Sequence, residues 1–190
     1  IVTLSDGTQY KFFVLNDVWK LIQIRDIALK QIDLKYSSNG RLIELHSNSV
    51  LALYCQYDKE GQLIGLRCPN TEALIVEYTV EEGELTSASN QSGLVETYAY
   101  RNDALLLTRK RPSGYTHYFE WQGDGKNAKC IRNYGDNNTY DYRFFFGDGE
   151  SSYTDTLGNR WLFNHDNNGK LLKKTSPEGR VQEWKYDELG

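Results

Sequence analysis

The fold of this chain is decided by residues 98–142, which read YAYRNDALLLTRKRPSGYTHYFEWQGDGKNAKCIRNYGDNNTYDY. This stretch contains three pairs of aromatic residues, each pair separated by one other residue: Tyr98-Ala99-Tyr100, Phe119-Glu120-Trp121 and Tyr140-Asp141-Tyr142. The second aromatic residue of each pair follows that of the previous pair by 21 residues. A fixed period of this length is typical of a repeat protein, in which each period is one supersecondary unit.

The same register extends to both ends of the chain. We define the reference position as the second residue of each pair, and it recurs in steps of 21 to 23 residues. Its occupants are Leu15, Tyr36, Tyr57, Tyr78, Tyr100, Trp121, Tyr142, His165 and Tyr186. The position two residues earlier holds only apolar or aromatic residues, namely Phe13, Leu34, Cys55, Val76, Tyr98, Phe119, Tyr140, Phe163 and Trp184. We expect residues 1–190 to be a single segment of about nine units, more degenerate in residues 1–95, and a fragment of a longer chain.

Each unit is predicted to be a β-hairpin. Before the reference position, apolar residues alternate with polar ones, as Ile32, Leu34 and Tyr36 do, and this is the pattern of a strand. After it comes a polar turn that closes on glycine, in Ser38-Asn39-Gly40, Lys59-Glu60-Gly61, Glu81-Glu82-Gly83 and Asn167-Asn168-Gly169. A second turn follows half a unit later, in Pro112-Ser113-Gly114, Leu157-Gly158-Asn159 and Pro177-Glu178-Gly179.

We therefore predict an all-β fold of tandem hairpins of about 21 residues, because two short strands and two turns use up one period. The hairpins would pair into one large, curled antiparallel sheet with the reference rings in ladders across it. The alternative is a β-propeller, since two units equal one four-stranded blade. In a propeller, odd and even units would differ, so the sequence pattern would repeat every 42 residues. The reference positions and the positions two residues earlier instead repeat about every 21 residues.

The composition argues against several classes of protein. The 190 residues carry 22 Lys and Arg against 26 Asp and Glu, so the net charge of −4 argues against a nucleic-acid-binding surface. The longest apolar runs are too short to span a membrane, and the sequence shows no targeting signal. Aromatic residues make up 13% of the chain, which argues against disorder and favours strands.

No motif for catalysis, cofactor binding or metal binding stands out. The histidines, His46, His117 and His165, are scattered, and the three cysteines lack the spacing of a zinc site. We expect Cys55, Cys68 and Cys130 to be free thiols. The Gly-Asp-Gly segments 123–125 and 147–149 lack the further oxygen ligands of a calcium loop, so we expect turns there. An enzyme with paired carboxylates is the least favoured class, and we predict no catalytic, cofactor or metal site.

The aromatic columns allow two interpretations. As structure, the rings pack one face of the sheet; as function, exposed Tyr and Trp rings stack on sugars in a carbohydrate- or cell-surface-binding module. We expect packing, with a cost of about 3–5 kcal/mol for truncating Phe119 or Trp121 to alanine if the ring is fully buried.

The turn segments resemble a known family. Tyr57-Asp58-Lys59-Glu60-Gly61-Gln62-Leu63 and Tyr186-Asp187-Glu188-Leu189-Gly190 look like the tyrosine–aspartate (YD) repeat, and His165-Asp166-Asn167-Asn168-Gly169 is the same motif with His for Tyr. The stretch from Leu105 onward is similar to the core of bacterial Rhs proteins. On this resemblance the turn residues of the motif are Asp58, Gly61, Asp166, Gly169, Asp187 and Gly190. The chain departs from the motif at some positions. The Tyr of the motif is replaced by Leu15 and His165, and the Asp is replaced by Ser37, Thr79, Arg101, Gln122 and Arg143.

The resemblance implies a non-catalytic shell. In this family the repeats form a strip that spirals into a hollow cocoon around a C-terminal toxin domain of a polymorphic toxin, delivered to competitor or host cells. The partners implied are that toxin cargo, the remaining repeats and secretion-apparatus components, with a glycan as the alternative ligand. The parent protein would be bacterial and secreted. Family members often cleave themselves at an Asp-Pro motif, which this sequence lacks. We also expect self-association through open strand edges.

Overall fold

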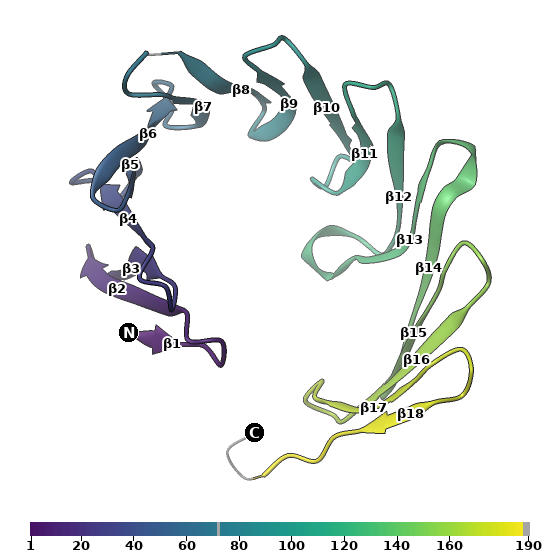
Figure 1. Ribbon diagram of the computed structural model, residues 1–190. Coiled ribbons are helices and arrows are strands. Elements are labelled where there is room, and N and C mark those ends of the chain that lie inside the picture. Colours follow the sequence, from purple (N-terminus) through teal and green to yellow (C-terminus); the bar gives the residue numbers. More distant parts are fainter. Residues whose placement is uncertain (72, 188–190) are drawn as a thin grey trace. The chain divides into compact units, whose positions relative to one another are not determined.

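The computed structural model describes residues 1–71 and 73–187. They fall into two compact units, Ile1–Val95 and Glu96–Gly190. Each unit is a succession of antiparallel hairpins (Figure 1). The all-β prediction is confirmed. No helix among the described residues has the length and hydropathy needed to cross a membrane.

The first unit is a meander in which each strand pairs with its neighbours in the chain. Its strands are β1 (Val2–Thr3), β2 (Gln9–Leu15), β3 (Val18–Arg25), β4 (Gln31–Tyr36), β5 (Leu42–Ser47), β6 (Val50–Tyr57), β7 (Leu63–Arg67), β8 (Leu74–Glu81) and β9 (Glu84–Asn90).

The second unit repeats this arrangement. Its strands are β10 (Val95–Tyr100), β11 (Leu106–Lys110), β12 (Thr116–Gln122), β13 (Lys129–Gly135), β14 (Thr139–Gly147), β15 (Glu150–Thr154), β16 (Arg160–His165), β17 (Leu171–Thr175) and β18 (Val181–Glu183). Two single-turn 3-10 helices, η1 (Gly125–Asn127) and η2 (Asp136–Asn138), lie in the connections on either side of β13.

The continuous pairing argues against the β-propeller alternative. A propeller divides its strands into separate four-stranded blades. Here the ladder continues from β10 through to β18 without such a division. The curl that we expect for the assembled sheet stays a prediction.

Most connections are one recurring turn. In the example at Asp58, the Asp58 N–H donates to the carbonyl oxygen of Gln62 at 3.0 Å, and the Gly61 N–H donates to the carbonyl oxygen of Asp58 at 3.2 Å. Gly61 has a φ of 86°, which only glycine adopts without strain. The same bonds close the turns that begin at Leu4, Asp26, Ser37, Asn90, Arg101, Arg111, Asp155, Asp166 and Ser176.

Other connections are tighter. Asn16-Asp17, Asn48-Ser49 and Glu82-Gly83 have positive φ at both residues, as two-residue hairpin turns require. The turn predicted at residues 81–83 is therefore one residue shorter, because Glu81 still belongs to β8. Asp148 and Gly149 likewise connect β14 to β15, as predicted.

The strand register gives each unit two different faces. Directly paired residues share a face, so Leu34, Leu45 and Leu53 lie together, as do Cys55, Leu66 and Val76. The opposite face carries Asp33 and His46. In the second unit the corresponding face is aromatic, and its paired residues include Phe119, Tyr142, Phe144, Tyr153, Trp161 and Phe163.

Each unit is a single layer without a second layer to cover it. No apolar side chain among the described residues is fully buried. Phe119 and Trp121 are only half-buried, so the condition attached to the cost of about 3–5 kcal/mol is not met. A sandwich buries its faces between two sheets, whereas a single sheet leaves both faces open to partial solvent contact.

Candidate functional site

The candidate site is the line of reference residues, because it recurs in every repeat. Leu15, Tyr36, Tyr57, Tyr100 and His165 are the last residues of β2, β4, β6, β10 and β16. Tyr78, Trp121 and Tyr142 lie within β8, β12 and β14, and Tyr186 follows β18. Tyr186 is 43% exposed, whereas the reference residues from Tyr36 to His165 are half-buried.

Four reference rings make the same hydrogen bond to the other strand of their own hairpin. The Tyr57 hydroxyl donates to the carbonyl oxygen of Leu42 at 2.7 Å, and the Trp121 Nε1–H donates to that of Leu106 at 2.8 Å. Tyr36 donates in the same way to Leu21, and Tyr186 to Leu171, both at 2.8 Å. In each case the acceptor lies 15 residues before the ring. We call these bonds the ring-to-carbonyl bonds.

A β-bulge accompanies several of these acceptors. The register shifts between Lys35 and Tyr36, so that Tyr36 faces Leu42 and Ile43 is left without a directly paired residue. Equivalent shifts occur before Tyr57, Tyr100, Trp121 and His165. A bulge interrupts the main-chain ladder, and a side-chain donor can satisfy a carbonyl group beside it.

A cation lies over three of the four rings. The Arg41 guanidinium is 5.7 Å from the centre of the Tyr57 ring, and the Lys170 ammonium is 5.2 Å from that of Tyr186. Lys20 lies over Tyr36 at 5.8 Å. Each cation directly precedes the leucine that accepts the ring-to-carbonyl bond. At Tyr57 and Tyr186 the sequence Gly-cation-Leu therefore supplies a turn glycine, a cation–π contact and a main-chain acceptor in three consecutive residues, whereas Trp19 precedes Lys20.

Sequence reasoning missed this arrangement. The sequence pattern alone assigned no role to Arg41-Leu42 or Lys170-Leu171. The detectable signal was the constant offset of 16 and 15 residues between the cation–leucine pair and the next reference ring. Tyr142 shows where the pattern fails, because the residue 15 positions earlier is Asn127, which lies in the 3-10 helix η1.

The motif aspartates hold their turns closed. The Asp58 carboxylate accepts a hydrogen bond from the Gln62 N–H at 2.7 Å, and Asp166 accepts one from the Lys170 N–H at 2.9 Å. Gly169 has a φ of 81°, like its counterpart Gly61. Gly190 lies outside the described residues.

The ring hydroxyls are held in the protonated form. Burial raises the pKa of Tyr36 and of Tyr57. Burial, together with a hydrogen bond to the Glu96 carboxylate, raises the pKa of Tyr98 to about 12. The Arg109 guanidinium, which binds Glu96 through two hydrogen bonds, lowers the pKa of that carboxyl group. These hydroxyls therefore remain hydrogen-bond donors well above neutral pH.

The aromatic face of the second unit is organised around Tyr153. Its ring centre lies 6.3 Å from that of Trp161 and 5.9 Å from that of Phe163, with nearly parallel planes. Tyr142 and Phe144 lie 6.1 and 6.4 Å from it. These distances fit offset ring packing across neighbouring strands.

The histidine and cysteine side chains, which could act in catalysis or metal binding, do not form a common cluster among the described residues. Nε2 of His46 lies 2.8 Å from Glu44, and Nε2 of His165 lies 2.8 Å from the Ser151 hydroxyl. The His117 ring contacts Tyr115 edge-on, and burial lowers its pKa. Cys55, Cys68 and Cys130 are free, as predicted. The described residues contain no group of His, Cys, Asp and Glu side chains that could hold a metal ion.

Comparison with known proteins identifies the repeat. The family model described as Teneurin YD-shell matches residues 9–190. This match confirms the resemblance to YD-repeat proteins. No curated protein matches the chain.

Solved toxin-complex structures share the fold. A crystal structure of TcdB2-TccC3-TEV is 15% identical with a TM-score of 0.54, over 95% of this chain and 10% of that chain. The Photorhabdus luminescens Tc holotoxin pore with the TccC3-D651A mutation is 15% identical with a TM-score of 0.54, over 94% of this chain and 10% of that chain. TcdB2-TccC3 without its hypervariable C-terminal region is 14% identical with a TM-score of 0.55, over 95% and 10%. The chain thus spans about a tenth of these proteins.

Proposed function

The chain belongs to the Teneurin YD-shell family, and from this premise we propose that it is a non-catalytic segment of a shell that encloses a toxin domain. The similarity to toxin-complex proteins supports this proposal through the shared fold. Because the chain spans about a tenth of those proteins, the enclosed cargo and its delivery are part of the proposal.

One observation carries the proposal, namely the ring-to-carbonyl bond at a constant offset of 15 residues. A wall that is one sheet thick has no core between layers, so its cohesion depends on contacts between neighbouring strands. Each of these bonds ties the two strands of one hairpin to each other, as β5 to β6 and β11 to β12. Adding hairpins by the same rule would extend such a wall.

The two faces of the sheet suit a wall with an inside and an outside. One face is apolar or aromatic. The other carries ion pairs such as Arg132 with Asp141 at 2.8 Å and with Glu120 at 3.1 Å. We propose that the apolar face lines the lumen and contacts the cargo, while the charged face meets water.

The partners in this proposal are the toxin cargo, the remaining repeats of a longer chain and components of a secretion apparatus. The parent protein would be a secreted bacterial toxin that acts on competitor or host cells. Self-association through open strand edges is expected only where an edge lacks its next hairpin.

Protease protection tests this function. The complete polypeptide that contains these 190 residues is treated with trypsin beside its C-terminal domain expressed alone. We expect the domain to survive inside the complete polypeptide at a trypsin concentration that digests the free domain. A variant lacking one hairpin of this segment, residues 106–122, should lose the protection. Equal digestion of the enclosed and the free domain would contradict the proposal.

A further inference from the structure

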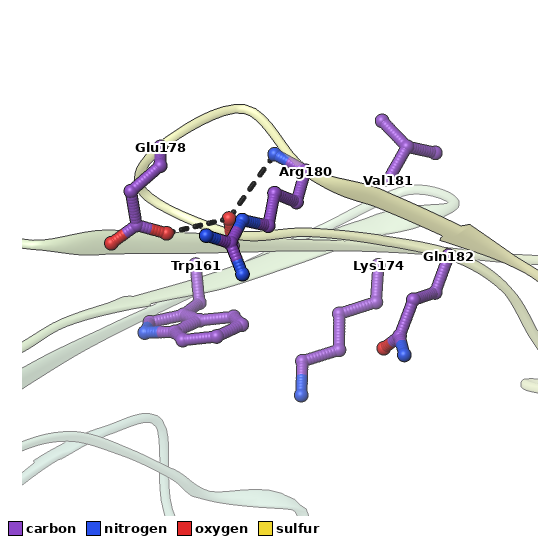
Figure 2. Close-up of a pocket in the computed structure, with 7 residues that line it drawn as sticks. Trp161, Lys174, Glu178, Arg180, Val181 and Gln182 are labelled. Atoms are coloured by element: carbon purple, nitrogen blue, oxygen red, sulfur yellow. Dashed lines mark hydrogen bonds between the residues drawn. The ribbon is translucent and has the colours of Figure 1, made fainter.

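The turn that joins β3 to β4 presents apolar side chains to solvent, and the shell function does not explain them. Ile27 is 74% exposed and Leu29 is 69% exposed, with one residue between them. The equivalent turn before β18 is polar: there Glu178 accepts a hydrogen bond from the Ser176 hydroxyl at 2.8 Å, and the Arg180 N–H donates to the same hydroxyl at 3.1 Å (Figure 2). Apolar side chains that are grouped on a surface, unlike single ones, mark a contact with another molecule.

Neighbouring connections enlarge this apolar surface. The Ile27 side chain lies against the preceding connection, because a Cβ at Gly7 would be 2.7 Å from the Ile27 Cγ2 atom. On the other side, the Asn48 N–H donates to the carbonyl oxygen of Gln31 at 2.9 Å, so the turn before β6 lies beside the start of β4. Three connections therefore meet at one end of the sheet. We call their exposed apolar side chains the apolar rim, namely Leu4, Ile27, Leu29 and Val50.

Leu29 also holds a backbone conformation that leucine adopts only under strain. Its φ is 62°, whereas the glycines at the equivalent turn positions, Gly40, Gly61 and Gly179, have φ values of 81°, 86° and 82°. Ala104 also stands where these turns have glycine, but its side chain is only a methyl group. A large apolar side chain that is both exposed and held at a strained position indicates a role outside folding.

One charge of each sign flanks the exposed pair. Asp26 precedes Ile27 and Lys30 follows Leu29. One oxygen of the Asp26 carboxylate accepts a hydrogen bond from the Lys30 main-chain N–H at 2.8 Å, and this bond closes the turn. Over the residues that the structure describes, neither the Asp26 carboxylate nor the Lys30 ammonium makes an ion pair. A turn with an acid on one side of an apolar pair and a base on the other is complementary to itself after a two-fold rotation.

A hollow of about 340 Å³ lies beside the same turn. Ile24 and Ile32 line it, and they share one face of the sheet because they pair directly across β3 and β4. Asp26 and Lys30 line it as well. The hollow can therefore accept an apolar side chain that arrives between two charges, and the turn beside it presents such a side chain in Leu29.

We propose that the apolar rim joins two copies of this chain in a two-fold dimer. Leu29 of each copy enters the hollow of the other copy, and Asp26 of each copy pairs with Lys30 of the other. In a two-fold contact each of these interactions is made twice, so one short turn supplies two apolar contacts and two ion pairs. The contact is made by turns, and it is therefore distinct from association through open strand edges.

Sedimentation velocity of the 190-residue chain over a series of concentrations tests this proposal. We expect a reversible dimer with a Kd of about 100 μM, as suits a small interface. Leu29→Gly should weaken dimer formation at least about 10-fold, because it removes the side chain that enters the hollow. The same variant should raise the temperature of unfolding, because glycine relieves the positive φ. A variant that merely damages the fold would lower both.

The matched control is Leu157→Gly. Leu157 is 86% exposed and lies in a turn with the same main-chain hydrogen bonds, but Asn159 stands there in place of Lys30. This variant should leave the Kd of the dimer unchanged.

Exchanging the charges tests the two-fold pairing itself. Asp26→Lys gives a turn with two bases, and Lys30→Asp gives a turn with two acids, so each variant alone should dimerise at least about 10-fold more weakly. An equal mixture of the two variants should dimerise again, because each base of one copy then meets an acid of the other. Lys30→Asp keeps the main-chain N–H that binds Asp26, and its circular dichroism spectrum should match that of the parent chain.

Three results would overturn the proposal. A parent chain that stays monomeric throughout the series would assign the apolar rim to a different partner. A dimer that forms equally well in Leu29→Gly and in both charge variants would show association through strand edges instead. A mixture of the two charge variants that stays monomeric would exclude the pairing of Asp26 with Lys30 between copies.

Discussion

The two units use the same hairpin but fill its apolar face differently. In the first unit the paired residues of this face are mostly aliphatic, such as Leu34, Leu45 and Leu53. In the second unit they are rings, with Tyr153 packed between Trp161 and Phe144. Both units nevertheless keep the ring-to-carbonyl bond, at Tyr36 and Tyr57 in the first, and at Trp121 and Tyr186 in the second.

This difference shows which parts of the repeat are interchangeable. The residues of the apolar face can be either aliphatic or aromatic, because no second layer packs tightly against that face. The turn and the ring-to-carbonyl bond are kept because they fix how consecutive strands meet. We therefore expect the largest mutational effects at positions of close backbone contact.

The largest effect should come from the buried strand glycines, which the two units hold in different surroundings. A Cβ at Gly65 would meet the backbone oxygen of Val76 at 2.9 Å, and that atom cannot move without disturbing the β7–β8 ladder. Gly65→Ala should therefore lower the free energy of unfolding by about 1–3 kcal/mol. Urea unfolding followed by circular dichroism measures it.

Gly135 provides the matched comparison in the second unit. There a Cβ would meet the end of the Tyr115 side chain, which can rotate away at the cost of its hydrogen bond to Thr139. Gly135→Ala should cost about 1 kcal/mol. A larger loss for Gly135→Ala than for Gly65→Ala would show that the clash with the backbone is not the dominant contact.

The next effect concerns the ring-to-carbonyl bond itself. Tyr57→Phe keeps the ring and its Arg41 contact but removes the hydroxyl that binds Leu42, and it should cost about 1 kcal/mol in the free energy of unfolding. Tyr186→Phe should cost less, because Tyr186 is 43% exposed and water can replace its hydroxyl. Tyr54→Phe, at an exposed ring of the same strand β6 as Tyr57, should have no effect. Equal stability of all three variants would show that the ring-to-carbonyl bond does not stabilise the fold.

Much of this fold could be predicted from the sequence, because the signals are local and repeated. The alternation ending at Tyr36 and the glycine turn at Gly61 specify strand and turn without any tertiary contact. The ring-to-carbonyl bonds could not be predicted, because they join the two strands of a hairpin through a main-chain atom that the sequence does not mark. The half-burial of Phe119 could not be predicted, because strand alternation shows that residues share a face but not whether a second layer covers it.

A smaller effect should come from the turns that lack glycine. Leu29 in the first unit and Ala104 in the second hold positive φ values of 62° and 63° where the equivalent turns have glycine. Ala104→Gly should raise the free energy of unfolding by about 0.5–1 kcal/mol, because it relieves the left-handed conformation. Leu29→Gly should act in the same direction. Thermal unfolding of both variants measures the gain in stability. A loss of stability in both variants would show that the positive φ values at Leu29 and Ala104 are not strained.

The smallest difference between the units should be seen at alkaline pH. Because the pKa of Tyr98 is raised from 10.0 to about 12 in the folded chain, folded Tyr98 keeps its proton where the unfolded residue loses it. Its contribution to stability is complete below pH 10.0 and is lost as the pH rises through about 12. Tyr98→Phe should flatten the alkaline decline in the free energy of unfolding more than Tyr57→Phe does, since no carboxylate binds the Tyr57 hydroxyl. The reverse order would contradict this assignment.

Electron cryomicroscopy of the complete polypeptide that contains these 190 residues would show whether the segment is a shell wall. We expect this segment to form part of the wall of a hollow shell, with its aliphatic and aromatic face toward enclosed density and with the Tyr57 and Trp121 bonds formed between paired strands. A segment that stands apart from any wall, or that turns its charged face toward the lumen, would contradict it.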